Sequence, residues 1–239
     1  MKLGIGTSEF RQSNSINWKD YFSSAYDFGY RYIDTSPFYS AANSERTIGD
    51  FLDARLKFRI TTKFGLPYFD RGSIYGKLSR RVSRAEKFDQ SWGSHLSPKQ
   101  ISGELKRSLT RLKVKDCYGY LMHSVDGTVN FDSWIENLLT LKEAGLVENI
   151  GLSIDLPIET DFSWADILQI PADLMNWSKA LNFNGIVMIN GFARPDATEL
   201  NSRVLEARNN FPNAVGIIRS SSLDHLKHFA NLAQGNLTL

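Results

Sequence analysis

Eight short, mostly apolar segments recur along the chain, and each is typical of a buried β-strand. Their apolar residues run almost without interruption. This pattern is typical of parallel strands that are packed inside a barrel and covered on the outside. The eight segments are Leu3–Thr7, Arg31–Asp34, Phe58–Lys63, Cys117–His123, Glu148–Ser153, Asp166–Ile170, Gly185–Ile189 and Ala214–Arg219.

Most of these segments are separated by stretches with the apolar spacing of a helix, three or four residues. In one of them, Ser97 is a suitable N-cap and Pro98 takes the first helical position. Gly145 and Gly235 are placed to end two others. The predicted helices are Asn17–Phe28, Glu45–Leu56, Pro98–Leu112, Phe131–Ala144, Thr198–Asn209 and Leu223–Gln234.

The eightfold alternation predicts one α/β domain over residues 1–239, a (β/α)8 barrel with eight parallel strands. We expect the fifth and sixth helices to be short. Asp155–Ala165 leaves room for only about one or two helical turns, and Ala172–Asn184 for little more. An open, doubly wound sheet is the alternative fold. It is disfavoured because no Gly-x-Gly-x-x-Gly motif follows the first strand.

Composition and charge indicate which partners and which cellular compartment to expect. Lys and Arg number 28 against 26 Asp and Glu, a net charge of +2, which is too slight to favour nucleic acid or an acidic membrane as a partner. The single cysteine, Cys117, cannot form an internal disulfide, and we expect it to be an inert core residue. The chain shows no secretory signal and no long apolar run. These features favour a cytoplasmic protein, and the sequence carries no pattern that indicates an oligomeric state.

One long segment, Phe64–Leu96, has no helical or strand pattern. It lies between the third strand and the third predicted helix and contains a cluster of basic residues and Trp92. Loops of this length in compact domains are often lids or binding loops. We therefore expect residues 64–96 to form a lid or an insertion.

Polar residues collect at the ends of the predicted strands, where barrel enzymes place their active sites. Tyr39 lies in the loop just after the second strand. The residues at the strand ends are Asp34, Lys63, His123, Ser153, Gln169, Asn190 and Arg219.

Four of these side chains suit the protonation of a carbonyl oxygen. A free tyrosine has a pKa of about 10, and a nearby lysine ammonium lowers it by favouring the phenolate. Asp34 would keep Lys63 charged and aimed at Tyr39, and His123 could orient a carbonyl by a hydrogen bond. The competing interpretation is a buried ionic network with a purely structural role.

Several motifs in sequence order resemble the aldo-keto reductase family. Tyr32–Tyr39 followed by Asn43–Gly49 resembles the segment that carries the family's catalytic Asp and Tyr, and Ile60–Lys63 resembles the strand with its catalytic Lys. Leu105–Leu112 with Cys117–His123, Gly145–Ser153 and Ile217–Ser222 resemble three further family segments. The resemblance covers Leu3 to about Leu232. It implies catalytic roles for Asp34, Tyr39, Lys63 and His123.

The same resemblance implies a bound NADP, with NAD as the alternative, and a small-molecule carbonyl substrate, which could be a sugar. Phe38 and Trp92 are candidate substrate-pocket residues, and no metal site is expected. Ser153 and Gln169 would hold the nicotinamide carboxamide, and Arg219, Ser220 and Ser221 would face the 2′-phosphate. The complete set of implied cofactor residues is Gly6, Thr7, Ser153, Gln169, Asn190, Arg219, Ser220, Ser221 and His225.

The chain departs from the family pattern mainly at the cofactor positions. Ile154 stands where the family has Asn, and His225 stands where many members have Arg. Phe192 is the one candidate for the aromatic that stacks on nicotinamide. From the residues on either side of the predicted strands and helices, we expect neither the family's N-terminal hairpin nor its long C-terminal loop.

Two other functions stay open at this point. The departures at the cofactor site favour a non-catalytic, nucleotide-binding or regulatory barrel. A barrel isomerase or aldolase would use Lys63 as a Schiff-base nucleophile. Asp34 argues against that second function, because a carboxylate keeps a neighbouring lysine protonated.

Overall fold

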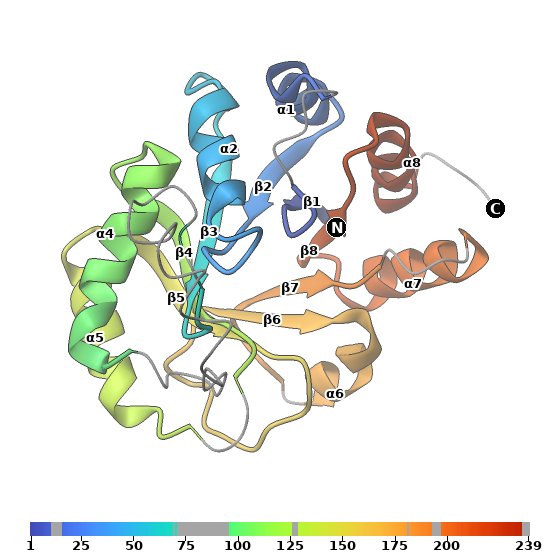
Figure 1. Ribbon diagram of the computed structural model, residues 1–239. Coiled ribbons are helices and arrows are strands. Elements are labelled where there is room, and N and C mark those ends of the chain that lie inside the picture. Colours follow the sequence, from blue (N-terminus) through green and yellow to red (C-terminus); the bar gives the residue numbers. More distant parts are fainter. Residues whose placement is uncertain are drawn as a thin grey trace, which may run out of the picture.

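The chain folds into a closed barrel of eight parallel strands. A computed structural model describes residues 1–10, 16–68, 70, 96–125, 129–180, 182–192 and 197–235. Each strand pairs with its neighbour in sequence, and β8 pairs back onto β1. Figure 1 shows the helices as an outer ring around these strands. The predicted (β/α)8 barrel is confirmed, and the open sheet is excluded.

Every predicted strand is present, with bounds that differ by one residue at most at either end. Continuous apolar character located them correctly because both faces of each strand are covered, one by the barrel interior and one by helices. The strands are β1 (Lys2–Gly6), β2 (Tyr30–Asp34), β3 (Arg59–Phe64), β4 (Cys117–Met122), β5 (Val147–Ser153), β6 (Ile167–Pro171), β7 (Ile186–Asn190) and β8 (Val215–Arg219).

The six predicted helices are also present, together with the short helix α6 in the interval between β6 and β7. Ser97 begins the third of them through a capping box with Gln100, and the first turn from Pro98 to Gln100 is a 3-10 helix. The helices are α1 (Trp18–Asp27), α2 (Asn43–Phe51), α4 (Ile101–Leu112), α5 (Asp132–Glu143), α6 (Met175–Ala180), α7 (Ala197–Asn210) and α8 (Leu223–Gln234). Among the described residues, no helix is long and apolar enough to cross a membrane.

Two segments differ from the prediction because side chains bond to nearby backbone. The second helix was predicted to reach Leu56 but ends at Phe51. Asp53 accepts a hydrogen bond from the Arg55 backbone N–H at 2.9 Å, a local bond that competes with helix continuation. Residues 154–166, between β5 and β6, form turns without any helix. There Asp161 accepts the Ser163 backbone N–H at 2.8 Å.

The barrel interior is a small apolar cluster that lies directly beneath the polar strand ends. Side chains two residues apart on a strand point to the same side, so Asp34 lies above Tyr32 and Gln169 above Ile167. Gly119 leaves space in this interior, because a Cβ there would lie 2.9 Å from the side chains of Ile167 and Thr61. The cluster comprises Tyr32, Tyr118, Leu121, Ile167, Met188, Val215 and Ile217. Cys117 is buried in the outer core, as expected, and burial raises the pKa of its thiol to about 12.

Candidate active site

Lys63 is the centre of the polar group at the carboxyl ends of the strands. Its side chain is 0% exposed. Its Nζ donates to Asp34 Oδ1 at 2.6 Å, to the Thr35 carbonyl at 3.2 Å and to the Tyr39 hydroxyl at 3.1 Å. The three donor positions of the ammonium are therefore all used. The structure brings Asp34, Lys63 and Tyr39 together in the order predicted from the sequence.

A buried ion pair on the adjacent helix fixes the loop that carries Tyr39. Glu45, on the first turn of α2, is fully buried. It accepts hydrogen bonds from Thr62 Oγ1 at 2.6 Å and from Arg111 Nε at 2.7 Å. These bonds join α2 to β3 and α4. They hold the start of α2, and with it the end of the preceding loop, against the strand that carries Lys63.

Two opposing effects act on the pKa of the Tyr39 hydroxyl. Burial raises the pKa of the Tyr39 hydroxyl, and the positive charge of Lys63 lowers it by less, so the net pKa lies above the ordinary value. Burial acts to lower the pKa of Lys63, but Asp34 and Tyr39 raise it above its usual value. Before any ligand binds, Tyr39 is a protonated phenol and Lys63 an ammonium ion. Lys63 lowers the pKa of Tyr39 as predicted, but burial raises it by more.

His123 lies beside Tyr39 as a neutral imidazole. Burial, with a further contribution from Lys63, places its pKa well below the ordinary value of 6.5. The two rings are perpendicular, with centroids 5.4 Å apart, and Phe38 contacts the ring of His123 at 5.8 Å. Phe38 itself is 47% exposed. The other predicted substrate-pocket residue, Trp92, lies outside the described residues, as does most of the segment 64–96.

A cavity of about 230 Å³ opens onto this group, and four of the nine predicted cofactor residues line it. These four are Gly6, Ser153, Asn190 and Arg219. Arg219 ends β8 beside Gly6, and a Cβ at Gly6 would lie 2.8 Å from the Arg219 side chain. The full lining is Gly6, Ser8, Asp34, Tyr39, His123, Ser124, Ser153, Asp155, Pro171, Asn190, Gly191, Ile217 and Arg219.

Gln169 has one amide atom bonded and the other unsatisfied. Its Nε2 donates to Asp34 Oδ1 at 2.9 Å. Its Oε1 is buried and has no hydrogen-bond partner among the described residues. Buried polar atoms are rarely left without a partner, so this oxygen is suited to accept an N–H from a bound molecule such as a carboxamide.

The predicted phosphate-binding residues lie around the turn between β8 and α8. The Ser220 hydroxyl accepts the Ser222 N–H at 3.0 Å and lies 3.4 Å from His225 Nδ1. Ser221 and His225 are exposed. Of this set, Arg219 alone lines the cavity.

Three residues discussed at the sequence level face away from the cavity. Thr7 is fully buried, and its hydroxyl contacts the Asp34 carbonyl at 3.1 Å and the Thr35 hydroxyl at 2.9 Å. Phe192 packs in the core against Phe229 with ring centroids 5.4 Å apart, so it does not occupy the position of a nicotinamide-stacking aromatic. Ile154 is likewise a core residue.

The sequence did not single out several residues that the structure places in or beside the site. Ser8, Ser124 and Asp155 line the cavity. Ser36 does not line it, but its Oγ lies 3.1 Å from Nδ1 of His123. Ser36 belongs to the motif that identified Asp34 and Tyr39, but small hydroxyl residues in loops carry no distinctive pattern.

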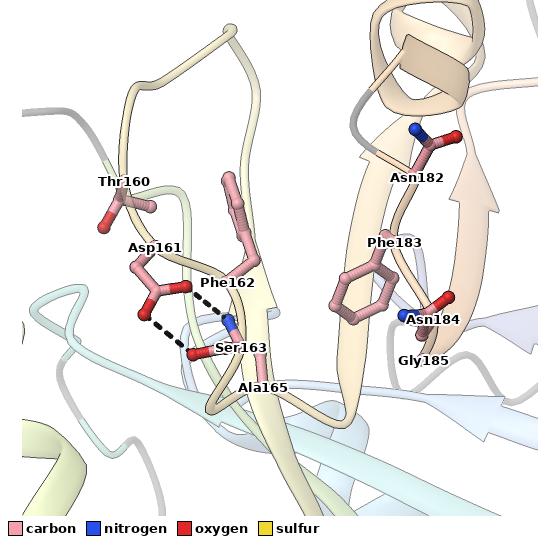
Figure 2. A pocket seen from close by; sticks show the side chains of 9 residues that line it. All are labelled: Thr160, Asp161, Phe162, Ser163, Ala165, Asn182, Phe183, Asn184 and Gly185. Atoms are coloured by element: carbon pink, nitrogen blue, oxygen red, sulfur yellow. Dashed lines mark hydrogen bonds between the residues drawn. The ribbon is translucent and has the colours of Figure 1, made fainter.

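A larger cavity, of about 460 Å³, lies at the opposite end of the strands (Figure 2). It is formed by the segments that precede β6 and β7, with Phe162 and Phe183 on its walls. Among the described residues that line it, the one carboxylate, Asp161, is hydrogen-bonded to the backbone and side chain of Ser163. This end of a barrel generally serves stability, and no catalytic combination of side chains is present among the residues that line it.

Comparison with known proteins identifies the family. The profile of the Aldo/keto reductase family matches residues 2–186. The chain therefore belongs to the aldo/keto reductase family.

Individual relatives are distant. An uncharacterised oxidoreductase of Bacillus subtilis, YqkF, is 30% identical over 132 residues, which span 54% of this chain and 37% of that protein. The holo form of an aldo-keto reductase from Bacillus halodurans superposes with a TM-score of 0.73 at 16% identity, covering 98% of this chain and 86% of that one. An aldo-keto reductase from Klebsiella pneumoniae in complex with NADPH gives 0.70 at 14% identity, covering 99% and 86%.

Proposed function

We propose that this protein is an oxidoreductase that reduces an aldehyde or ketone to an alcohol, with Tyr39 as the proton donor. The observation that carries the proposal is the hydrogen-bonded set of Asp34, Lys63 and Tyr39, of which Asp34 and Tyr39 line a cavity together with His123. Membership of the aldo/keto reductase family supports the same reaction.

Residues that line the cavity, together with Gln169, which is buried beside Asp34 and is not part of the cavity lining, fit a nicotinamide cofactor. The orphaned Oε1 of Gln169 would accept the carboxamide N–H, and Ser153 is next to it in the β5–β6 register. Arg219 would contact a phosphate of the cofactor. A bound NADPH, or NADH, would supply hydride to the carbonyl carbon. We favour NADPH because Arg219 lines the cavity and lies next to Ser220 and Ser221, although only Arg219 reaches the cavity wall.

The residues of this chain would supply the proton and the orientation. His123, neutral at physiological pH, donates a hydrogen bond to the carbonyl oxygen. Tyr39 transfers its hydroxyl proton to that oxygen as the carbon accepts hydride, which gives the alcohol and leaves a phenolate. Lys63 stabilises the phenolate by its hydrogen bond, and Asp34 keeps Lys63 charged. A proton from solvent then restores Tyr39.

This geometry disfavours the Schiff-base mechanism. A nucleophilic lysine must lose its proton, whereas Lys63 donates three hydrogen bonds and its pKa is raised. The non-catalytic nucleotide-binding barrel is the second candidate function. It is favoured by the buried positions of Phe192 and Ile154, which leave the cofactor site with fewer side-chain contacts.

The proposal is tested by following NADPH oxidation with a panel of small aldehydes, ketones and sugars. Tyr39→Phe should lower kcat/KM by about 10²–10⁴-fold while NADPH still binds. Tyr30→Phe is the matched control, because Tyr30, at the start of β2, has a buried hydroxyl that donates to the Leu226 carbonyl on α8, away from the cavity. Turnover by Tyr39→Phe at the wild-type rate would rule out the proton-donor role.

Titration of the protein with NADPH and with NADH, followed by fluorescence, separates the two candidate functions. Binding of NADPH together with substrate-dependent oxidation supports the reductase. Nucleotide binding without turnover on any substrate supports the non-catalytic barrel. If neither nucleotide binds, the cofactor assignment is wrong.

A further inference from the structure

The hydroxyl of Ser36 lies between a backbone amide and the ring of His123. Ser36 is buried, in the loop between Asp34 and Tyr39. Its Oγ accepts the backbone N–H of Phe38 at 3.1 Å and lies 3.1 Å from Nδ1 of His123. Its backbone carbonyl accepts the N–H of Tyr39 at 3.0 Å. One residue thus contacts the ring of His123 and the backbone of Tyr39.

The hydrogen-bond partners of Ser36 distinguish the two neutral forms of His123. A neutral imidazole carries one proton, on Nδ1 or on Nε2. If Nδ1 carried it, Nδ1 would donate to Ser36 Oγ, and the hydroxyl proton would need another acceptor. Among the described residues, the hydroxyl contacts no acceptor other than Nδ1. A buried donor without a partner is unfavourable.

The opposite arrangement satisfies every group. The hydroxyl accepts from Phe38 N–H and donates to Nδ1 of His123, and the ring proton is then on Nε2. This nitrogen is the one left for a ligand, because the contact with Ser36 occupies Nδ1 and the ring lines the cavity beside Tyr39. Because the pKa of His123 is low, its ring is neutral and therefore exists as one of the two forms.

We propose that Ser36 is a positioning residue that holds His123 as the Nε2–H form, so that His123 donates its hydrogen bond to the substrate carbonyl oxygen beside Tyr39. The role of His123 toward the carbonyl oxygen rests on the proposed reductase function. The hydrogen bond from Ser36 and the position of the ring proton do not depend on that function. Because Ser36 also anchors the Tyr39 backbone, it sets the relative position of both groups that face the carbonyl oxygen.

The wild-type protein by itself provides the first test. Nitrogen NMR of ¹⁵N-histidine-labelled protein separates protonated from unprotonated ring nitrogens. The chain has four histidines, and the His123 signals are those lost in His123→Gln. We expect a protonated Nε2 and an unprotonated Nδ1. A protonated Nδ1 in the wild-type protein would overturn the proposal without any further variant.

Kinetics of Ser36→Ala provides the second test. Without the hydroxyl, His123 should populate both neutral forms, and kcat/KM for carbonyl reduction should fall by about 10- to 100-fold. Nucleotide binding should be retained. Ser178→Ala is the matched control, since Ser178 is a buried hydroxyl on α6 that does not line the cavity. Unchanged NMR signals and unchanged kcat/KM in Ser36→Ala would contradict the proposal.

The NMR and kinetic results together distinguish the role of Ser36 from the proposed reductase function. His123 could be protonated at Nε2 in the wild-type protein and lose this preference in Ser36→Ala, while neither protein reduces carbonyls. That result would support the hydrogen bond from Ser36 but reject both its catalytic role and the proposed function. Activity with His123 protonated at Nδ1 would retain the proposed function and reject the role of Ser36.

Discussion

Gln169 on β6 donates a hydrogen bond of 2.9 Å to the carboxylate of Asp34 on β2, across the barrel. The two residues are 135 positions apart in sequence. Asp34 Oδ1 therefore accepts from both Lys63 and Gln169. The bond also fixes the orientation of the Gln169 amide, because the carboxylate requires the NH₂ group. It thereby directs Oε1 away from Asp34 as a free acceptor.

Gln169→Met should affect both stability and cofactor binding. It removes a buried hydrogen bond to a charged group, for which the expected loss is about 1.5–3 kcal/mol of unfolding free energy. It also removes the acceptor proposed for the carboxamide, so NADPH binding should weaken. Urea denaturation and fluorescence titration measure the two effects. Gln234→Met is the control, an exposed amide that contacts the Phe28 carbonyl at 3.3 Å. A Gln169→Met variant with wild-type NADPH affinity would argue against the carboxamide contact.

Lys63→Met should be strongly destabilising, and a second change should partly reverse the effect. The single variant leaves the buried carboxylate of Asp34 without its cation, a loss of about 3–5 kcal/mol. In Asp34→Asn/Lys63→Met the carboxylate is also gone, so the double variant should be more stable than Lys63→Met. Chemical denaturation of the four proteins of the cycle provides the measurement. Additive losses would mean that the pair does not interact energetically.

The stability of the protein should fall as the pH drops below about 6.5, in part because of His123. The folded-state pKa of His123 is well below 6.5, so below that pH the unfolded chain binds a proton that the folded protein does not. The free energy of unfolding therefore decreases as pH falls through this window. His123→Gln should show a smaller difference between urea midpoints at about pH 7.5 and about pH 5.

His228→Gln is the control for this pH dependence, because His228 is exposed on α8. Its pH dependence should equal that of the wild-type protein. If the stability of His123→Gln depended on pH in the same way as that of the wild-type protein, His123 would keep an ordinary pKa in the folded state.

Ala41→Gly should stabilise the protein. Ser40, Ala41 and Ala42 follow Tyr39 with φ angles of 51°, 55° and 65°, a left-handed conformation that disfavours residues with a Cβ. Glycine removes that strain at Ala41 but adds freedom to the unfolded chain, and the net gain should be about 0.5–1 kcal/mol. Thermal denaturation measures it. Ala54→Gly, at an exposed position without a positive φ, should give no gain.

The sequence by itself determined the barrel and the identity of the catalytic candidates. The strands could be predicted because both of their faces are buried, which makes their apolar residues nearly continuous. The helices could be predicted because one face is buried, which repeats apolar residues every three or four positions. Asp34, Lys63 and His123 could be grouped because the ends of parallel strands in a closed barrel meet at one face. Tyr39 was found through its motif and its place just after β2.

Only the tertiary structure decided how these groups act on one another. The net rise in the Tyr39 pKa depends on burial by many elements, and the Gln169–Asp34 and Ser36–His123 contacts join residues far apart in sequence. Phe192 faces Phe229 and not the cavity for the same reason. Hydrogen bonds and desolvation depend on distances of a few ångströms between segments, and no local sequence pattern encodes those distances.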